Sequence, residues 1–354
     1  MCSSDLRLLL TRQTTEQYKD AWKLIVETQE KNSVEVEFGY LLYPETNKKT
    51  EINLFKGKLI HADTAPEKFS SFFPSELKHK IGTINFPDKK HYLEKVKKLK
   101  HHIQLGNIYE INYCIQFTAE EVEINPYQLF LKLNAVSEAP HACLAKFDDD
   151  WIICSSPERF IQRSGNKLIT QPIKGTARRG SNLAEDEHLK NNLKNSLKEK
   201  TENVMIVDVA RNDLSRIAEK GSVQVEELFG VYSYRQVHQM ISTVSCTIDK
   251  TCSFDEIINA TFPMASMTGA PKIRAMQLID EFENFKRNFY SGSIGFIDKS
   301  GDFDFNVVIR SMVYNERNKT ISFSVGSAIT SMCEPEKEWE ECMIKADALL
   351  KLLN

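Results

Sequence analysis

The stretch RFIQRSGNKLITQPI, residues 159–173, decides the fold class, because it has the pattern of two strands joined by a tight turn. Ser164-Gly165-Asn166 between the two halves is typical of a hairpin. Other strand-like segments occur along the chain at 33–44, 108–122, 141–148, 151–156, 234–248, 291–298, 304–314 and 320–329. Strands joined by hairpins, with few long helices, favour an α+β protein over a regular alternation of strands and helices.

Four segments carry apolar residues at helical spacing, and these are 86–106, 183–212, 271–285 and 335–353. Residues 1–80 are more weakly patterned. The motifs described below are scattered from residue 158 to residue 341, so the second half of the chain should fold as one unit around one site. We therefore expect a single fold, with 1–85 as its N-terminal part and 86–354 as the region that holds the site.

The composition is that of a soluble globular chain of 354 residues, 41% apolar and 27% charged, with a net charge of −3. A general nucleic-acid-binding protein would usually be basic. No run approaches the roughly 18 apolar residues of a membrane-spanning helix, and the first residues lack the pattern of a secretory signal. None of the eight cysteines forms a C-x-x-C pair, so we expect reduced thiols in a cytoplasmic protein.

Two pairs of glutamates are spaced three residues apart on predicted helices. Glu199 and Glu202 belong to the second helix, and Glu338 and Glu341 belong to the last, so each pair shares a helix face. Four carboxylates from two helices could hold Mg²⁺, which prefers oxygen ligands and meets anionic substrates. Ordinary acidic helix faces would give the same spacing, because acidic residues are favoured near helix N-termini.

The segment FPMASMTGAPKIRAMQLIDEFE, residues 262–283, enters a predicted helix through a glycine turn. Free backbone N–H groups at Thr268, Gly269 and Ala270 would bind an anion, although a plain helix start has the same pattern. Arg310 ends the apolar run NVVIR and is a candidate for binding a carboxylate. A surface ion pair is the alternative for this arginine.

Lys174 ends an apolar run between Pro172 and Gly175. A lysine held among apolar neighbours loses basicity and can act as a nucleophile. Glu158, in SSPERF, could donate a proton to a departing hydroxyl group. A strand-end lysine without a chemical role is the alternative at this point.

Seven motifs resemble, in their order, those of the chorismate-utilising enzymes. They are SSPERF (155–160), PIKGTARRG (172–180), EKTENVMIVDVARNDLSRI (199–217), FPMASMTGAPKIRAMQLIDE (262–281), RNFYSGSIGFID (287–298), DFNVVIRSM (304–312) and GSAITSMCEPEKEWEE (326–341). This family includes component I of anthranilate synthase and of aminodeoxychorismate synthase, and the isochorismate and salicylate synthases.

The resemblance implies a large α+β fold of stacked antiparallel sheets with helices outside, and chorismate bound between the sheets. It implies a Mg²⁺ shell made of Glu199, Glu202, Glu338 and Glu341. The implied substrate-binding set comprises Thr268, Gly269, Ala270, Lys272, Tyr290, Arg310 and Gly326. A dicarboxylate substrate beside four carboxylates would be repelled, so a cation must bridge them.

Lys174 distinguishes activities within the family, because aminodeoxychorismate synthases resemble P-I-K-G-T here and anthranilate synthases resemble P-I-A-G-T. The resemblance implies that Lys174 attacks C2 of chorismate while Glu158 protonates the departing C4 hydroxyl. Ammonia then adds at C4 and gives 4-amino-4-deoxychorismate, the precursor of p-aminobenzoate and folate. Gln239 stands where anthranilate synthases have a histidine.

The alternatives are synthesis of anthranilate, isochorismate or salicylate, and a non-catalytic chorismate-binding protein. The motifs use most of the chain and leave no room for a glutamine amidotransferase domain. The resemblance therefore implies a separate glutaminase subunit that supplies ammonia, with free ammonium as another source.

Overall fold

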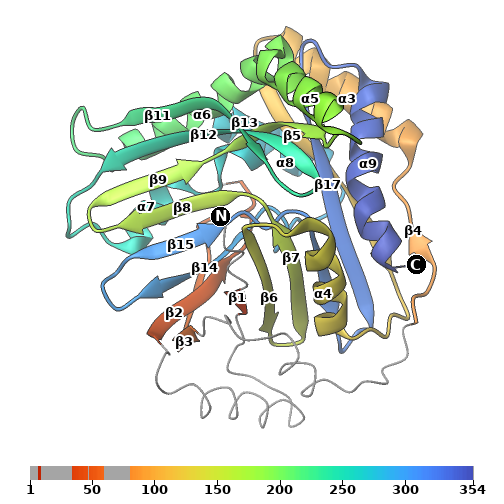
Figure 1. Ribbon diagram of the computed structural model, residues 1–354, viewed down its shortest axis with the longest axis horizontal. Coiled ribbons are helices and arrows are strands. Elements are labelled where there is room, and N and C mark those ends of the chain that lie inside the picture. The colour runs from red at the N-terminus through yellow and green to blue at the C-terminus, as the bar shows by residue number, and fades with distance from the viewer. Residues whose placement is uncertain (1–6, 9–33, 47, 60–79, 354) are drawn as a thin grey trace.

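Two large sheets form the centre of the computed structural model, which describes residues 7–8, 34–46, 48–59 and 80–353. Sheet A has the order β1–β6–β7–β16–β17–β5–β13, with β4 also paired to β5 (Figure 1). Sheet B has the order β10–β12–β9–β8–β15–β14–β2–β3, with β11 also paired to β12. Among the described strands every pair is antiparallel except β1 with β6.

The strands of sheet A are β1 (Arg7–Leu8), β4 (Ile84–Asn85), β5 (Glu110–Ala119), β6 (His141–Phe147), β7 (Asp150–Ser156), β13 (Gly269–Ala270), β16 (Ser311–Asn315) and β17 (Thr320–Thr330). Those of sheet B are β2 (Val34–Leu41), β3 (Ile52–Leu59), β8 (Arg159–Ser164), β9 (Lys167–Gln171), β10 (Ile173–Arg178), β11 (Gln224–Ser233), β12 (Val237–Thr247), β14 (Ser293–Asp298) and β15 (Phe303–Asn306).

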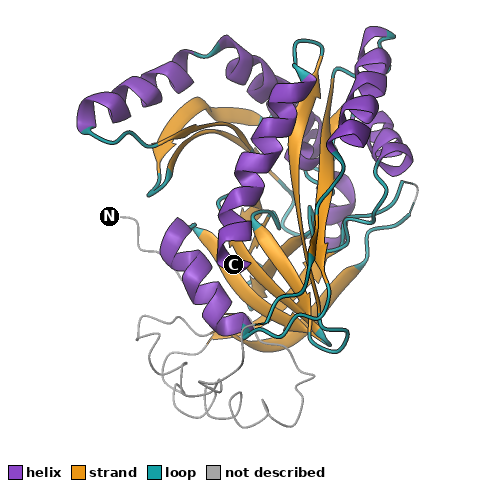
Figure 2. Ribbon diagram, turned by 90° about the vertical axis from the view of Figure 1, so that its right-hand side faces the viewer, coloured by secondary structure: helices purple, strands orange, loops and turns teal. Residues whose placement is uncertain are grey.

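The helices lie outside the sheets (Figure 2). They are α3 (Lys89–Gln104), α4 (Pro126–Ser137), α5 (Leu183–Asn195), α6 (Leu197–Ser215), α7 (Phe254–Thr261), α8 (Lys272–Phe282) and α9 (Pro335–Leu353), with a 3₁₀ turn at Ala265–Met267. Helices α3, α4 and α9 pack on sheet A, and α9 also packs against both α3 and α4, whereas α5 and α6 pack on β10 and β12 of sheet B.

Three apolar clusters stabilise this arrangement. The largest fills the space between sheet A and its helices and includes Phe117, Phe323 and Leu349. A second lies between sheet B and helices α6 and α7, and a smaller third cluster includes Phe147 and Ile294. Burial of apolar surface is the dominant favourable term in folding, so these layers hold the sheets and the helix ends in place.

The predicted α+β class of antiparallel sheets with outer helices is confirmed. The hairpin at 159–173 forms β8 and β9, with Ser164 paired to Lys167. Gly165, in its turn, has φ of 62°, which suits glycine. The predicted strand 108–122 becomes β5, which pairs with β17 along its whole length from Glu110 to Ala119.

Two predicted elements were wrong because each contains a break. The predicted strand 304–314 is two strands, β15 in sheet B and β16 in sheet A, and the chain crosses between the sheets at residues 307–310. The predicted helix 183–212 is divided at Ser196, whose hydroxyl accepts a hydrogen bond from the N–H of Glu199 and caps α6. The first break places Arg310 between the sheets, and the second places Glu199 in a first helical turn.

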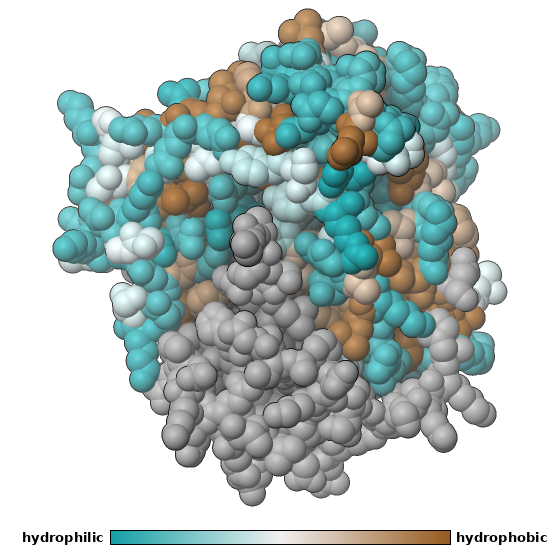
Figure 3. Space-filling view, in the orientation of Figure 1, coloured by the Kyte–Doolittle hydropathy of each residue, from teal (hydrophilic) through white to brown (hydrophobic). Residues whose placement is uncertain are grey.

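Hydrophilic side chains predominate on the upper part of the face in Figure 3, where α3 and α5 lie. Among the described residues, no helix combines the length and apolar character needed to cross a bilayer.

Candidate active site

Two charged side chains meet between the sheets. Lys174 of β10 comes from sheet B and Glu110 of β5 comes from sheet A, and Lys174 Nζ lies 2.9 Å from Glu110 Oε1. Glu110 is fully buried and the Lys174 side chain is 12% exposed. Sequence reasoning missed Glu110, although a glutamate within the apolar strand YEINYCIQF was a visible signal.

The prediction that Lys174 has a lowered pKa is wrong, because the protein groups around the lysine raise its pKa. Burial alone would lower the pKa of this ammonium group, but attraction to the carboxylates of Glu110 and Glu202 outweighs burial and raises it. The prediction considered the apolar neighbours of Lys174 in sequence. The acidic neighbours come from β5 and α6, which are distant in sequence.

Glu158 lies in the turn between β7 and β8 and is only 3% exposed. Its Oε1 accepts a 3.4 Å hydrogen bond from the N–H of Ile173, the residue before Lys174. Burial raises the pKa of Glu158 to about 7, against the opposing influence of Ser266, Lys174 and Arg310. A carboxyl group with this pKa is a suitable proton donor near neutral pH.

Arg310 is placed by the crossing from β15 to β16, where its φ is 49°. Burial lowers the pKa of the guanidinium, while Glu158 opposes that effect. Within the described ranges no hydrogen bond or ion pair engages the guanidinium, so its planar set of donors is available to a carboxylate. Its role in substrate binding stays a prediction.

The predicted anion site at the start of α8 is partly occupied by the protein itself. Thr268 is fully buried, and its N–H and its hydroxyl both donate hydrogen bonds within the preceding 3₁₀ turn. Gly269 and Ala270 form β13 and pair with Ile111 and Glu110. The free N–H predicted at Thr268 was therefore wrong, and this segment instead fixes the start of β5 beside Glu110.

Lys272 is also engaged within the protein. Its Nζ donates to Asp213 Oδ2 at 2.5 Å, to the carbonyl of Pro263 at 2.6 Å and to that of Thr261 at 3.0 Å. Three contacts use all three ammonium protons. Lys272 thus anchors α8 to α6, and its predicted role in substrate binding stays a prediction.

Tyr290 and Gly326, the other two predicted binding residues, both lie beside Cys114. Cys114 Sγ is 3.8 Å from the Tyr290 hydroxyl, and Gly326 pairs with Cys114 across β17 and β5. A Cβ atom at Gly326 would come within 2.6 Å of Cys114 Sγ, so glycine is required for close packing here. Among the described residues no hydrogen bond or ion pair joins either residue to Lys174, and their binding roles stay predictions.

The four predicted metal-binding glutamates lie on α6 and α9, near the start of β10. Lys198 Nζ lies between the helices, 3.1 Å from Glu338 Oε1 and 3.9 Å from Glu202 Oε1. Glu341 pairs with Lys345 at 2.6 Å. Within the described parts of the chain no three acidic, histidine or cysteine side chains converge as a metal-binding group.

The electrostatics of this acidic cluster nevertheless fit a cation. Burial raises the pKa values of Glu199 and Glu338, and it raises that of Glu202 to about 7. For Glu341, Lys345 and other cations outweigh burial and lower the pKa. Glu202 Oε1 is buried and accepts no hydrogen bond from the described residues. Buried carboxylates with a free oxygen suit a hard divalent ion, and Mg²⁺ here stays a prediction.

Other polar residues near β10 have structural partners. Arg178 pairs with Glu185, and Arg179 forms a two-pronged pair with Asp186, so both arginines hold α5. His238 also contacts Asp186, at 3.0 Å. Gln239, by contrast, is 2% exposed and its Oε1 accepts no hydrogen bond from the described residues. It lies opposite Thr176 in β10, which makes it a further candidate for contacting a ligand.

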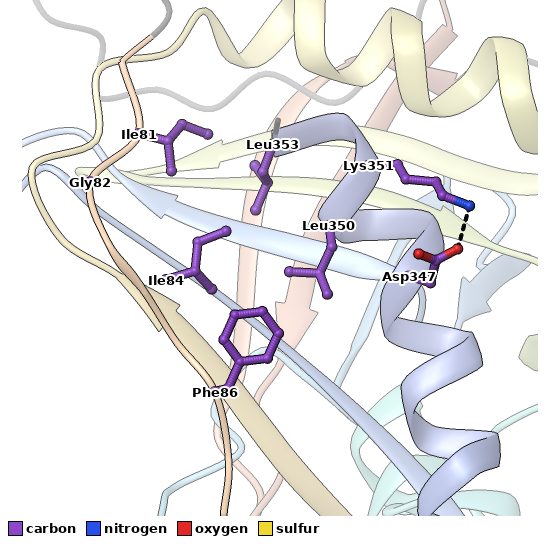
Figure 4. Close-up of a pocket in the computed structure, with 8 residues that line it drawn as sticks. All are labelled: Ile81, Gly82, Ile84, Phe86, Asp347, Leu350, Lys351 and Leu353. Atoms are coloured by element: carbon purple, nitrogen blue, oxygen red, sulfur yellow. Dashed lines mark ion pairs between the residues drawn. The ribbon is translucent and has the colours of Figure 1, made fainter.

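Two cavities lie elsewhere. A groove of about 620 Å³ runs between residues 81–86 and the C-terminal end of α9, with Phe86 and Leu350 on its walls (Figure 4). Its ion pair, Lys351 with Asp347, is exposed, and α9 carries Glu338 at its opposite end. A second cavity, of about 440 Å³, is lined by Tyr290 among others. Neither cavity includes Lys174 or Glu158, which are packed within the protein.

Ionisable side chains with perturbed pKa values, buried between two sheets, are typical of an enzyme active site rather than a structural core. The class defined by the fold is therefore an α+β protein of stacked antiparallel sheets, with a candidate active site between them. The chain belongs to the chorismate binding enzyme family, whose sequence pattern matches residues 11–351.

Curated relatives agree with this assignment. The chain is 41% identical over 267 residues to the chloroplastic aminodeoxychorismate synthase of Arabidopsis thaliana, covering 74% of this chain and 29% of that protein. It is 36% identical over 263 residues to aminodeoxychorismate synthase component 1 of Bacillus subtilis, covering 74% and 55%. It is also 36% identical over 266 residues to anthranilate synthase component 1 of Aquifex aeolicus, covering 75% and 53%. The chain thus spans only part of these relatives.

Solved structures share the fold. Anthranilate synthase component I of Streptococcus pneumoniae superposes with a TM-score of 0.71 at 21% identity, over 97% of this chain and 86% of that one. The menaquinone-specific isochorismate synthase MenF of Escherichia coli gives 0.73 at 19% identity, over 97% and 84%. At this identity the likeness establishes the fold alone.

Proposed function

We propose that this chain is component I of an aminodeoxychorismate synthase, which converts chorismate and ammonia into 4-amino-4-deoxychorismate. The observation that carries the proposal is the placement of Lys174 next to a buried acid. Glu158 accepts a hydrogen bond from the residue preceding Lys174, and its pKa is raised to about 7 by burial. Relatives that bear this name, at 36% and 41% identity, support the same activity.

In the proposed reaction Lys174 attacks as the free amine. Its nitrogen bonds to C2 of chorismate, the two ring double bonds shift and the C4–O bond breaks. Glu158 gives its proton to the departing hydroxyl, which leaves as water. Ammonia then bonds to C4, the double bonds shift back and the C2–N bond breaks, which frees Lys174. Arg310 would hold a substrate carboxylate through its unpaired guanidinium.

The cofactor and the partner are also proposals. We place Mg²⁺ at Glu199, Glu202, Glu338 and Glu341, where the ion when bound would supply the positive charge that a dicarboxylate substrate needs beside these glutamates. A separate glutaminase subunit would deliver ammonia. The protein would act in the cytoplasm, in the route to p-aminobenzoate and folate.

The test uses the purified chain with chorismate, Mg²⁺ and ammonium, and mass spectrometry of the products. We expect 4-amino-4-deoxychorismate, and we expect Lys174→Ala to lose this product. Lys319→Ala, which removes an exposed lysine, is the matched control. Anthranilate together with pyruvate would contradict the proposal, and so would isochorismate formed without ammonium. No turnover, with or without a glutaminase, would favour a non-catalytic chorismate-binding protein.

A further inference from the structure

Glu110 has an unusual environment for a carboxylate. It is fully buried, and it begins β5 between two partner strands, with Ala270 of β13 on one side and Thr330 of β17 on the other. Apart from the ion pair with Lys174, neither of its oxygens accepts a hydrogen bond from the described residues. An unpaired buried carboxylate is costly, so Lys174 is the group that compensates it.

Lys174 depends on that contact in return. Burial favours the neutral amine, and the carboxylates around it reverse this preference. The acidic groups that face Lys174 come from several elements, and they are Glu110 on β5, Glu158 in the β7–β8 turn, Glu199 and Glu202 on α6, and Glu341 on α9. Within the described residues only Glu110 lies in ion-pair contact with Lys174.

We propose that Glu110 restrains the nucleophile, because its buried carboxylate holds the Lys174 amine in place and keeps it protonated, and therefore unreactive, before substrate binds. Glu110 is thus a positioning residue that acts through Lys174. An ammonium group has no free electron pair, so the amine must lose its proton before it can attack a carbon atom. The catalytic meaning of the restraint rests on the proposed function, whereas the restraint itself can be measured without any substrate.

The direct test is the reactivity of Lys174 toward a small reagent. Reductive methylation with formaldehyde and cyanoborohydride modifies only the free amine, and peptide mass spectrometry reports each lysine separately. The reaction is run from about pH 7 to about pH 11, in the presence of a chelator and without chorismate. Lys319 on the surface serves as the internal reference for reagent delivery.

The decisive variant is Glu110→Gln, which keeps the shape and removes the charge. We expect the pH midpoint of Lys174 methylation to fall by about one to three units, so that methylation at about pH 8 is at least about tenfold faster than in the wild type. Glu110→Asp, which retains the charge, should restore at least part of the high midpoint. Glu158→Gln is the matched control, because it neutralises a carboxylate of the same site that makes no ion pair with Lys174, and its shift should be clearly smaller.

An unchanged midpoint in Glu110→Gln would overturn the restraint, as would an equal shift in Glu158→Gln. If Glu110→Gln does not fold, the pH profile of Lys174 methylation in the wild type decides the question. A midpoint below about 9 would show that burial lowers the pKa of Lys174 and that Glu110 does not restrain the amine. The turnover assay separates the two ideas. If the methylation midpoint of Lys174 shifts in Glu110→Gln but the wild type does not aminate chorismate, the proposed function is contradicted and the restraint is supported.

Discussion

Replacing Lys272 by methionine separates a structural role from a binding role, because the two roles predict different measurements. In the wild type the Lys272 ammonium serves Asp213 and two backbone carbonyls, and the two side chains are 13% and 6% exposed. Methionine fills similar space without a charge. Asp213 is then buried without a partner, and breaking such a pair costs about 3–5 kcal/mol of unfolding free energy.

The loss should depend on pH in a defined direction. Burial, which outweighs the attraction of Lys272, raises the pKa of Asp213 to about 6. A carboxyl whose folded pKa exceeds its unfolded value of about 3.9 stabilises the fold fully below that value, and the contribution is lost as pH rises through the folded pKa. Without Lys272 the folded pKa rises further. The variant should therefore lose most unfolding free energy at about pH 8. Near pH 5 it lacks only the two hydrogen bonds to the backbone carbonyls, a loss of about 1–3 kcal/mol.

Urea unfolding at both pH values gives the free energies, and Lys351→Met, which removes an exposed ion pair, is the matched control with a much smaller expected change. Chorismate affinity should change little in molecules of Lys272→Met that remain folded. An unfolding free energy equal to that of the wild type, together with a large rise in KM, would refute the structural reasoning and return Lys272 to the binding set.

The remaining predictions concern the reaction itself. Lys174→Ala should slow amination at C4 by at least about 100-fold with the fold intact by circular dichroism, and unimpaired turnover would exclude it as the nucleophile. Wild-type turnover should rise with pH up to about 7 and then level off, because Lys174 must lose a proton while Glu158, whose pKa is about 7, must keep one, and Glu158→Gln should lose most of the rate. Arg310→Lys should raise KM for chorismate about tenfold or more, because an ammonium cannot replace the two-pronged guanidinium contact, and an unchanged KM would place the carboxylate elsewhere.

Local patterns in the sequence were sufficient for much of the fold. The hairpin at Gly165 was predicted from its turn residues, and the helices α3 and α9 from their apolar spacing, because these features depend on neighbours within a few positions. The break at Ser196 also had a local signal, since a serine three residues before Glu199 is typical of a helix N-cap. It was missed because leucines at helical spacing continue through it.

Other features could not be predicted from local patterns. The crossing before Arg310 depends on a positive φ at a residue that rarely adopts one, and the apolar run NVVIR gives no sign of it. The protonation of Lys174 depends on Glu110, which is distant in sequence and belongs to the other sheet. Long-range charge pairs are set by topology, so the sequence indicated which residues carry chemistry better than it indicated their electrostatic state.

The same carboxylates that suit a cation also hold the proton on Lys174, and this links two parts of the proposed reaction. Glu202 raises the pKa of Lys174 and is itself a proposed ligand of Mg²⁺. A positive charge placed among the glutamates of α6 and α9 would weaken the field that favours the ammonium form. Glu110, which makes the direct contact, would then be the main remaining restraint. We infer that cation binding and the reactivity of the Lys174 amine are coupled by charge. Added Mg²⁺ should therefore accelerate methylation of Lys174, and this acceleration should be larger in Glu110→Gln than in Glu202→Gln.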